Sequence, residues 1–88
     1  MKIEIKKPTE EELKKLGVKD WGIWTKEVSE FDWYYDDKET CYVLEGEVEV
    51  ETDDGTVEFS KGDLVTFPKG LECVWKVKKP IKKHFKFG

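Results

Sequence analysis

The sequence contains no arginine, asparagine, glutamine or alanine, and all sixteen of its basic residues are lysines. Abundant lysine and glutamate with few amides are typical of heat-stable proteins. The complete absence of arginine and alanine goes further and suggests the hypothesis of a computationally redesigned or consensus-like sequence. Whether the protein is naturally heat-stable or redesigned, its surface composition concerns stability and origin. We therefore expect any function to reside in the interior.

Other absences exclude whole classes of protein. No apolar run approaches the ~20 residues of a membrane-spanning helix, and the first residues lack the apolar core of a secretory signal. The net charge is −4 and the lysines are scattered among twenty acidic residues, so no basic patch favours nucleic acid. We therefore expect a cytoplasmic protein that binds neither membranes nor nucleic acid. Cys41 and Cys73 are expected to be reduced, with a disulfide between them as the alternative.

The length of 88 residues predicts a single domain, residues 1–88, with a small core. Residues 2–6 alternate apolar and charged side chains and predict a short strand. Thr9 and Glu12 then have the spacing of a capping box, and Gly17 is a helix stop. These signals predict one short N-terminal helix.

From Trp21 to the C-terminus, short runs of alternating apolar and polar residues predict β-strands separated by turns. Asp53-Asp54-Gly55 is a hairpin signal between two of them. The predicted strands are residues 21–25, 28–35, 39–45, 47–51, 57–59, 64–67, 71–77 and 81–87. About eight or more antiparallel strands with one short helix predict an all-β fold, either a closed barrel or a sandwich.

Two spacings of turn residues point to a known family. Glu39 is followed after six residues by Gly46, and Gly62 is followed after five residues by Pro68 and then, one residue further on, by Gly70. The chain thereby resembles a cupin, a small jelly-roll β-barrel. It resembles still more closely the short single-domain cupins related to the ureidoglycine aminohydrolase cupin domain. The segments that carry this resemblance are Trp33–Tyr35, Glu39–Tyr42, Val43–Gly46, Phe67–Gly70, Cys73–Trp75 and Lys83–His84.

The resemblance also implies where a metal would bind. Cupin metal sites usually hold iron, manganese or nickel through three histidines and a glutamate. In this sequence the three histidine positions carry Trp33, Tyr35 and Cys73, and only Glu39 is retained. We therefore expect a degenerate metal site, with no metal and no cofactor. The alternative that stays open is a zinc site made by Glu39, Cys41 and Cys73.

Strand alternation predicts a mixed aromatic, thiol and charged lining for the barrel interior, a ligand pocket made by Trp33, Tyr35, Glu39, Cys41, Cys73, Trp75 and Lys83. The aromatic residues and cysteines are equally compatible with a role as core filler. Glu39 is not compatible with such a role, because burying a carboxylate without a partner costs free energy. We expect Lys83, which interrupts an apolar strand face, to pair with Glu39. Such a pair is either structural, or it binds a ligand and acts as an acid–base centre. A further alternative is that Glu39 is solvated at the mouth of the barrel. If the protein is an enzyme, Glu39 and Lys83 are the best catalytic candidates.

Three functions remain open on these grounds. The first is the binding of a small polar molecule in the barrel, or a stable scaffold without catalysis. The second, implied by the resemblance, is an enzyme of the ureidoglycine aminohydrolase type, which the replaced histidines disfavour. The third is an interaction module, with the protein a monomer or a homodimer and Tyr34, Tyr42 and Val74 as an outward apolar patch. His84, the only histidine, falls on the outer face and is expected to be a surface or interface residue.

Overall fold

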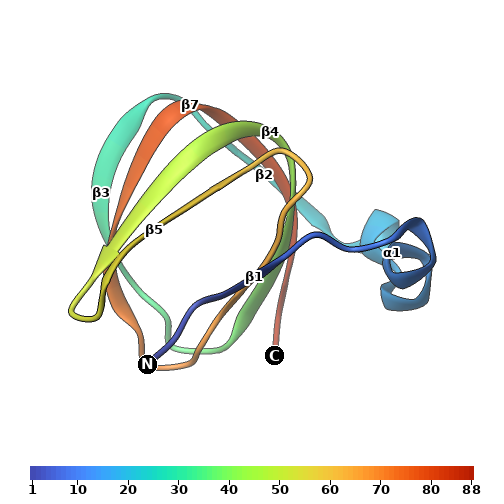
Figure 1. Cartoon of the computed structure of the whole chain (residues 1–88), viewed down its shortest axis with the longest axis horizontal. Helices are drawn as coiled ribbons and strands as arrows, with labels where there is room; N and C mark the ends of the chain where they lie inside the picture. Colours follow the sequence, from blue (N-terminus) through green and yellow to red (C-terminus); the bar gives the residue numbers. More distant parts are fainter.

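The computed structural model describes all 88 residues, most of them in seven β-strands. In chain order the elements are β1 (Glu4–Lys6), α1 (Glu10–Leu16), the short 3₁₀ helix η1 (Val18–Asp20), β2 (Gly22–Lys26), β3 (Ser29–Tyr34), β4 (Glu39–Thr52), β5 (Gly55–Ser60), β6 (Leu64–Phe67) and β7 (Glu72–Phe87). Every strand pair is antiparallel, and the strands curve around a common interior (Figure 1). The predicted all-β cupin jelly roll is confirmed.

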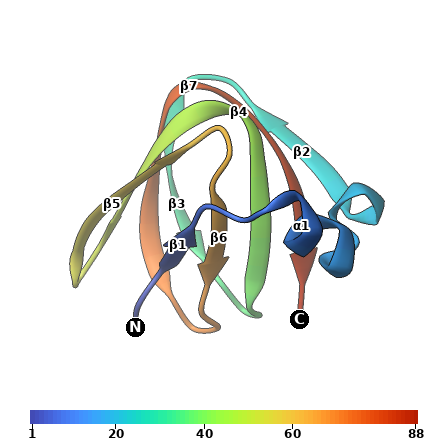
Figure 2. The same cartoon turned by 45° about the vertical axis from the view of Figure 1, so that its right-hand side comes forward.

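Two long strands, β4 and β7, form the frame of the barrel. They pair in opposite directions along most of their length, so that Glu39 lies opposite Phe87 and Glu51 lies opposite Val74. At one end of this ribbon β6, β1 and β2 extend the sheet, and at the other end β5 and β3 extend it (Figure 2). The two ends therefore form two facing layers whose inward side chains meet between them.

The ribbon bends where its two layers join. The sequence predicted a break in each long strand, at Gly46 and at Pro80, and this prediction was wrong: both strands continue, with an irregular register from Val43 to Val48. Gly46 has a φ of 104°, and a Cβ atom there would lie only 2.8 Å from the Cα atom of Ile81. Glycine and proline thus mark a bend within a strand, and the structure has seven strands in place of eight or more.

The helix forms where the capping signals predict it, and it lies outside the barrel. The Thr9 side chain accepts a hydrogen bond from the Glu12 N–H at 3.2 Å, and the Glu12 carboxylate accepts one from the Thr9 N–H at 3.3 Å. Helix α1 ends at Leu16, with Gly17 as its C-cap, and buries none of its residues. It stands to one side of the strands in both views (Figure 1, Figure 2) and does not close the barrel. No helix in the chain has the length and apolar character needed to cross a membrane.

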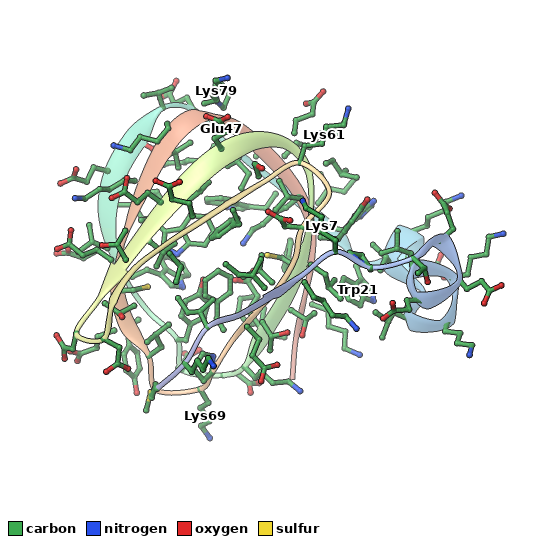
Figure 3. The ribbon with its side chains drawn as sticks, viewed as in Figure 1. Lys7, Trp21, Glu47, Lys61, Lys69 and Lys79 are labelled. Atoms are coloured by element: carbon green, nitrogen blue, oxygen red, sulfur yellow. The ribbon has the colours of Figure 1, made fainter.

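Apolar and charged residues are separated between the inside and the outside of the barrel. One cluster of fourteen buried residues packs between the layers. Charged side chains extend outward, as Glu47, Lys61, Lys69 and Lys79 do in Figure 3. Some of them form exposed ion pairs, such as Lys79 with Glu47 at 3.5 Å. Heat stability stays a prediction, because isolated exposed pairs contribute little.

Candidate functional site

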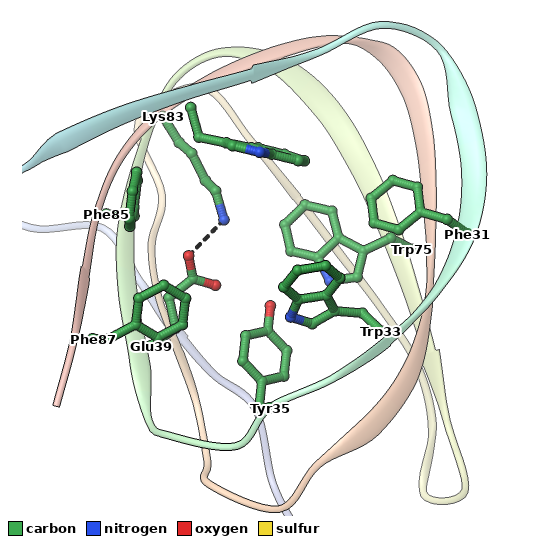
Figure 4. A pocket seen from close by; sticks show the side chains of 9 residues that line it. Phe31, Trp33, Tyr35, Glu39, Trp75, Lys83, Phe85 and Phe87 are labelled. Carbon is green, nitrogen blue, oxygen red and sulfur yellow. Dashed lines mark hydrogen bonds and ion pairs between the residues drawn. The ribbon is translucent and has the colours of Figure 1, made fainter.

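A cavity of about 140 Å³ lies between the two layers of the barrel (Figure 4). Nine residues line it, seven of them hydrophobic, namely Trp24, Phe31, Trp33, Tyr35, Glu39, Trp75, Lys83, Phe85 and Phe87. Trp33 and Phe87 are 46% and 47% exposed and form part of its rim, whereas Tyr35 and Trp75 are buried. The cavity is therefore open to solvent at the rim and walled mainly by aromatic rings.

The structure brings most of the residues predicted for the pocket together around this cavity, but not all of them. Five of the seven residues predicted for the pocket line the cavity, namely Trp33, Tyr35, Glu39, Trp75 and Lys83. Cys41 and Cys73 do not line it, and both belong to the buried cluster beside it. An inward direction on a strand is thus not enough to identify a cavity residue, because some inward side chains pack within the core while others line the cavity.

Four residues of the lining were not assigned to the site from the sequence. Phe31 alternates in phase with Trp33 and Tyr35, and Phe85 and Phe87 alternate in phase with Lys83, so extending the pocket along those strand faces would have found all three. Trp24 is different, because β2 is short and its inward face is set by pairing with β7. Its backbone lies directly opposite Lys83 in that pairing.

An ion pair between Glu39 on β4 and Lys83 on β7 supplies the charge in this cavity. The Lys83 Nζ atom donates a hydrogen bond to Glu39 Oε2 at 2.7 Å, and the two side chains extend toward each other (Figure 4). The residues are only 3% and 4% exposed. Lys83 Nζ also lies 4.7 Å from the ring centroid of Trp75 and 4.9 Å from that of Trp24. Indole faces attract an ammonium at such distances, so the cation has one carboxylate and two aromatic neighbours.

Tyr35, the residue after β3, directs its hydroxyl toward this ion pair (Figure 4). Its ring stacks on Phe67 with 4.8 Å between centroids, which holds its direction. Burial raises the pKa of the Tyr35 phenol well above its usual range, and the neighbouring charge of Glu39 raises it further. The phenol therefore stays protonated at all physiological pH values and presents an O–H donor to the cavity.

Cys41 and Cys73 are buried free thiols. Burial raises the pKa of Cys41 to about 12 and that of Cys73 to about 11, from an ordinary value of 9.0. Only the thiolate attacks a disulfide reagent. At pH 8 we therefore expect dithionitrobenzoate to react more slowly in the native protein than in urea, roughly 100-fold at Cys73 and roughly 1000-fold at Cys41. Absorbance measures the two rates, and equal rates would contradict the placement of these residues.

The side chains at the positions implied for metal ligands do not fit a metal ion. No three side chains among histidine, cysteine, aspartate and glutamate come together as a group that could hold one, so the alternative zinc set is not assembled. Cys73 Sγ instead donates to the carbonyl oxygen of Trp33 at 3.7 Å. Glu39 is paired with Lys83.

The outward residues considered for an interaction surface lie on three strands, with Tyr34 on β3, Tyr42 on β4 and Val74 on β7. Tyr42 lies opposite His84 near the end of that strand, whereas Val74 near its start lies opposite Glu51. Tyr34 is 57% exposed, while His84 is half-buried and its Nδ1 atom has no hydrogen-bond partner. A monomer or a homodimer stays a prediction.

Comparison with known proteins gives a consistent set of relatives. Residues 13–85 match the family model of the EutQ-like cupin domain. A DUF861 family protein from Thermotoga maritima is 61% identical, with a TM-score of 0.96, and the match covers 99% of this chain and 100% of that one. The Clostridium difficile EutQ protein is 26% identical with a TM-score of 0.70, over 75% of this chain and 52% of that one. A putative ethanolamine utilization protein Q from Salmonella typhimurium is 24% identical with a TM-score of 0.69, and the match covers 75% of this chain and 54% of that one.

These relatives agree on the barrel and differ in length. The chain spans about half the length of the two EutQ proteins, but all of the Thermotoga maritima protein. A search of curated proteins found no match. The family match begins within α1 and runs through β2 to β7, so it includes every strand that supplies a residue to the cavity. The protein therefore belongs to the EutQ-like cupin family.

Proposed function

We propose that this protein binds a small molecule inside its barrel. The body of the ligand would lie against the aromatic walls, and a polar group would meet Glu39, Lys83 and Tyr35. The observation that carries the proposal is the buried ion pair on the wall of an open cavity. A buried ion pair often contributes little net stability. A purely structural role therefore does not explain why this pair lines an open cavity.

The dimensions of the cavity limit the ligand. An engineered protein cavity of about 150 Å³ holds one benzene molecule, and this cavity has about 140 Å³. We therefore expect a ligand with one ring, or with a similar number of non-hydrogen atoms in a compact chain. Ligand pockets typically combine such apolar walls with a few converging polar groups that fix orientation.

An aminohydrolase of the ureidoglycine type is not favoured. The resemblance implies a metal for that reaction, and the donors around Glu39 do not fit one. A scaffold without a ligand is the competing function. It predicts that small molecules of every charge leave the cavity residues unaffected.

Nuclear magnetic resonance of the four indole N–H groups tests the proposal, because Trp24, Trp33 and Trp75 line the cavity and Trp21 does not. Benzyl alcohol, benzoate and benzylamine are titrated separately, so that the preferred charge is measured. We expect one of them to shift the three cavity signals in a saturable way while the Trp21 signal stays in place. No saturable shift with any of the three probes would favour the scaffold.

A double variant shows whether the ion pair binds the ligand. Replacing Glu39→Gln together with Lys83→Met should weaken the preferred probe about tenfold or more, since hydrogen bonds to charged groups contribute about 1.5–3 kcal/mol. The matched control is Glu51→Gln with Lys76→Met, which removes an exposed ion pair of similar length, 2.9 Å. Unchanged affinity in the first double variant, with a large loss of its stability, would mean that the pair is structural.

A further inference from the structure

We propose that Lys83 forms a Schiff base with a small aldehyde or ketone held in the barrel cavity. This inference rests on the proposed function, because the carbonyl compound is the ligand, and it goes further by naming the ligand's chemical class and the atom that reacts. It is carried by the placement of a lysine amine, a carboxylate and a phenol around one apolar cavity.

Lys83 differs from every other lysine in the chain. It is the only buried lysine of sixteen, with 4% of its surface exposed, yet it lines an open cavity. A lysine amine beside apolar walls is a common nucleophile towards carbonyl compounds. The other fifteen lysines are half-buried or exposed, and an ammonium that reaches solvent is strongly hydrated. Burial and access thus coincide at one amine.

Glu39 is placed to accept the proton that the amine must lose. Its Oε2 atom already accepts a hydrogen bond from Lys83 Nζ at 2.7 Å, so the transfer needs no intervening water. Tyr35 directs a protonated hydroxyl toward the same point (Figure 4) and can donate a hydrogen bond to the carbonyl oxygen. The three groups supply a nucleophile, a general base and an oxygen-stabilising donor.

The step balances without any further reagent. Glu39 takes one proton from the Lys83 ammonium, and the neutral amine attacks the carbonyl carbon while the carbonyl π-electron pair moves to oxygen. After a proton moves from nitrogen to this oxygen, the neutral carbinolamine carries a hydroxyl group. Glu39 returns its proton to that hydroxyl, the C–O bond breaks, and water leaves as the C=N bond forms. One ammonium and one carbonyl compound become one iminium ion and one water molecule.

The surroundings of the amine suit the charge of the product as well as that of the starting ammonium. The iminium carries the same positive charge as the ammonium, at the same nitrogen. It therefore keeps the ionised Glu39 and the faces of Trp24 and Trp75, which lie within 5 Å of Lys83 Nζ in the free protein. Aromatic walls also suit the apolar part of a small carbonyl compound and limit its size to about one ring.

Reductive trapping of the unmodified protein tests the inference. The protein is incubated with benzaldehyde and sodium cyanoborohydride at pH 7, and peptide mass spectrometry measures the benzylation rate at each lysine. We expect Lys83 to be modified at least tenfold faster than Lys76, whose exposed amine is paired with Glu51. Benzyl alcohol, which cannot react, should protect Lys83 and leave the rate at Lys76 unchanged.

Three outcomes are informative, and the first of them separates this inference from the proposed function. If benzyl alcohol shifts the cavity indole signals but Lys83 is trapped no faster than Lys76, the Schiff base is excluded and ligand binding stands. If the alcohol neither binds nor protects and Lys83 is also not trapped, both proposals fail for ligands of this size. Rapid trapping at Lys83 that the alcohol prevents supports both.

A variant of the base tests the role given to Glu39. Glu39→Gln keeps the shape of the side chain but cannot accept the proton, so trapping at Lys83 should slow about tenfold or more, since general bases typically contribute ~10²–10⁴-fold. Glu51→Gln, made as the control, should leave the Lys83 rate unchanged. If Glu39→Gln does not fold, the comparison of Lys83 with Lys76 in the unmodified protein still decides the proposal. An unchanged Lys83 rate in a folded Glu39→Gln protein would remove Glu39 from the mechanism.

Discussion

Replacing Lys83 with methionine is expected to lower the free energy of unfolding by about 3–5 kcal/mol, because the Glu39 carboxylate is left buried without its counter-charge. Both residues are under 5% exposed, so little water reaches the carboxylate that loses its partner. Small domains are stable by only about 5–15 kcal/mol in total. The single variant should therefore lose a large part of its stability in urea unfolding followed by tryptophan fluorescence.

Removing both charges is expected to cost much less than removing either one. Glu39→Gln alone strands the Lys83 ammonium and should be as damaging as Lys83→Met. The double variant should lie within about 2 kcal/mol of the wild-type protein, since neutral replacements of buried ion pairs are often tolerated. The exposed pair of Lys76 and Glu51 is the control, and its double variant should change stability little. Additive losses for the two buried residues would show that they do not interact as the structure has it.

The Glu39–Lys83 pair was predictable from the sequence because the alternation of side chains within each strand is a local signal. Both residues fall on strand faces that alternate clearly, and each is a charge among apolar neighbours. Period-two alternation fixes the inward direction, and the cost of a lone buried charge then requires a partner. What alternation does not give is the position across the sheet. Lys83 lies opposite Val43, not opposite Glu39, so the two side chains meet only because both extend into the cavity.

The course of the long strands was not predictable in the same way. Lys78-Lys79-Pro80 has the composition of a turn, and Gly46 has that of a strand end. Such residues interrupt regular pairing, but they do not say whether the chain reverses or only bends. That choice depends on the partner strand, because β4 and β7 bend together and keep their hydrogen-bonded pairing on both sides of the corner. Trp24 was missed for the same reason, because its direction depends on the pairing of β2 with its partner strand β7.

The corner itself gives the second large effect. Replacing Gly46 with alanine is expected to lower the free energy of unfolding by about 3 kcal/mol or more. Its φ of 104° strains any residue with a side chain, at about 1–3 kcal/mol. The added Cβ would also meet the carbonyl oxygen of Pro80 and lie 2.8 Å from Ile81 Cα, and such overpacking costs about 1–3 kcal/mol more. Both contacts are with backbone, which cannot move aside alone.

Gly55→Ala separates these two causes. Gly55 also has a positive φ, 122°, but a Cβ there would have no atom within 4 Å. Its replacement should therefore cost only the conformational strain, so the difference between the two variants measures the clash at the corner. That clash should also reach the cavity, since Ile81 precedes Lys83 by two residues on the same strand. In folded Gly46→Ala protein, benzaldehyde trapping at Lys83 should slow, whereas Gly55→Ala should trap normally. Equal stability and equal trapping in the two variants would mean that this corner does not position the lysine.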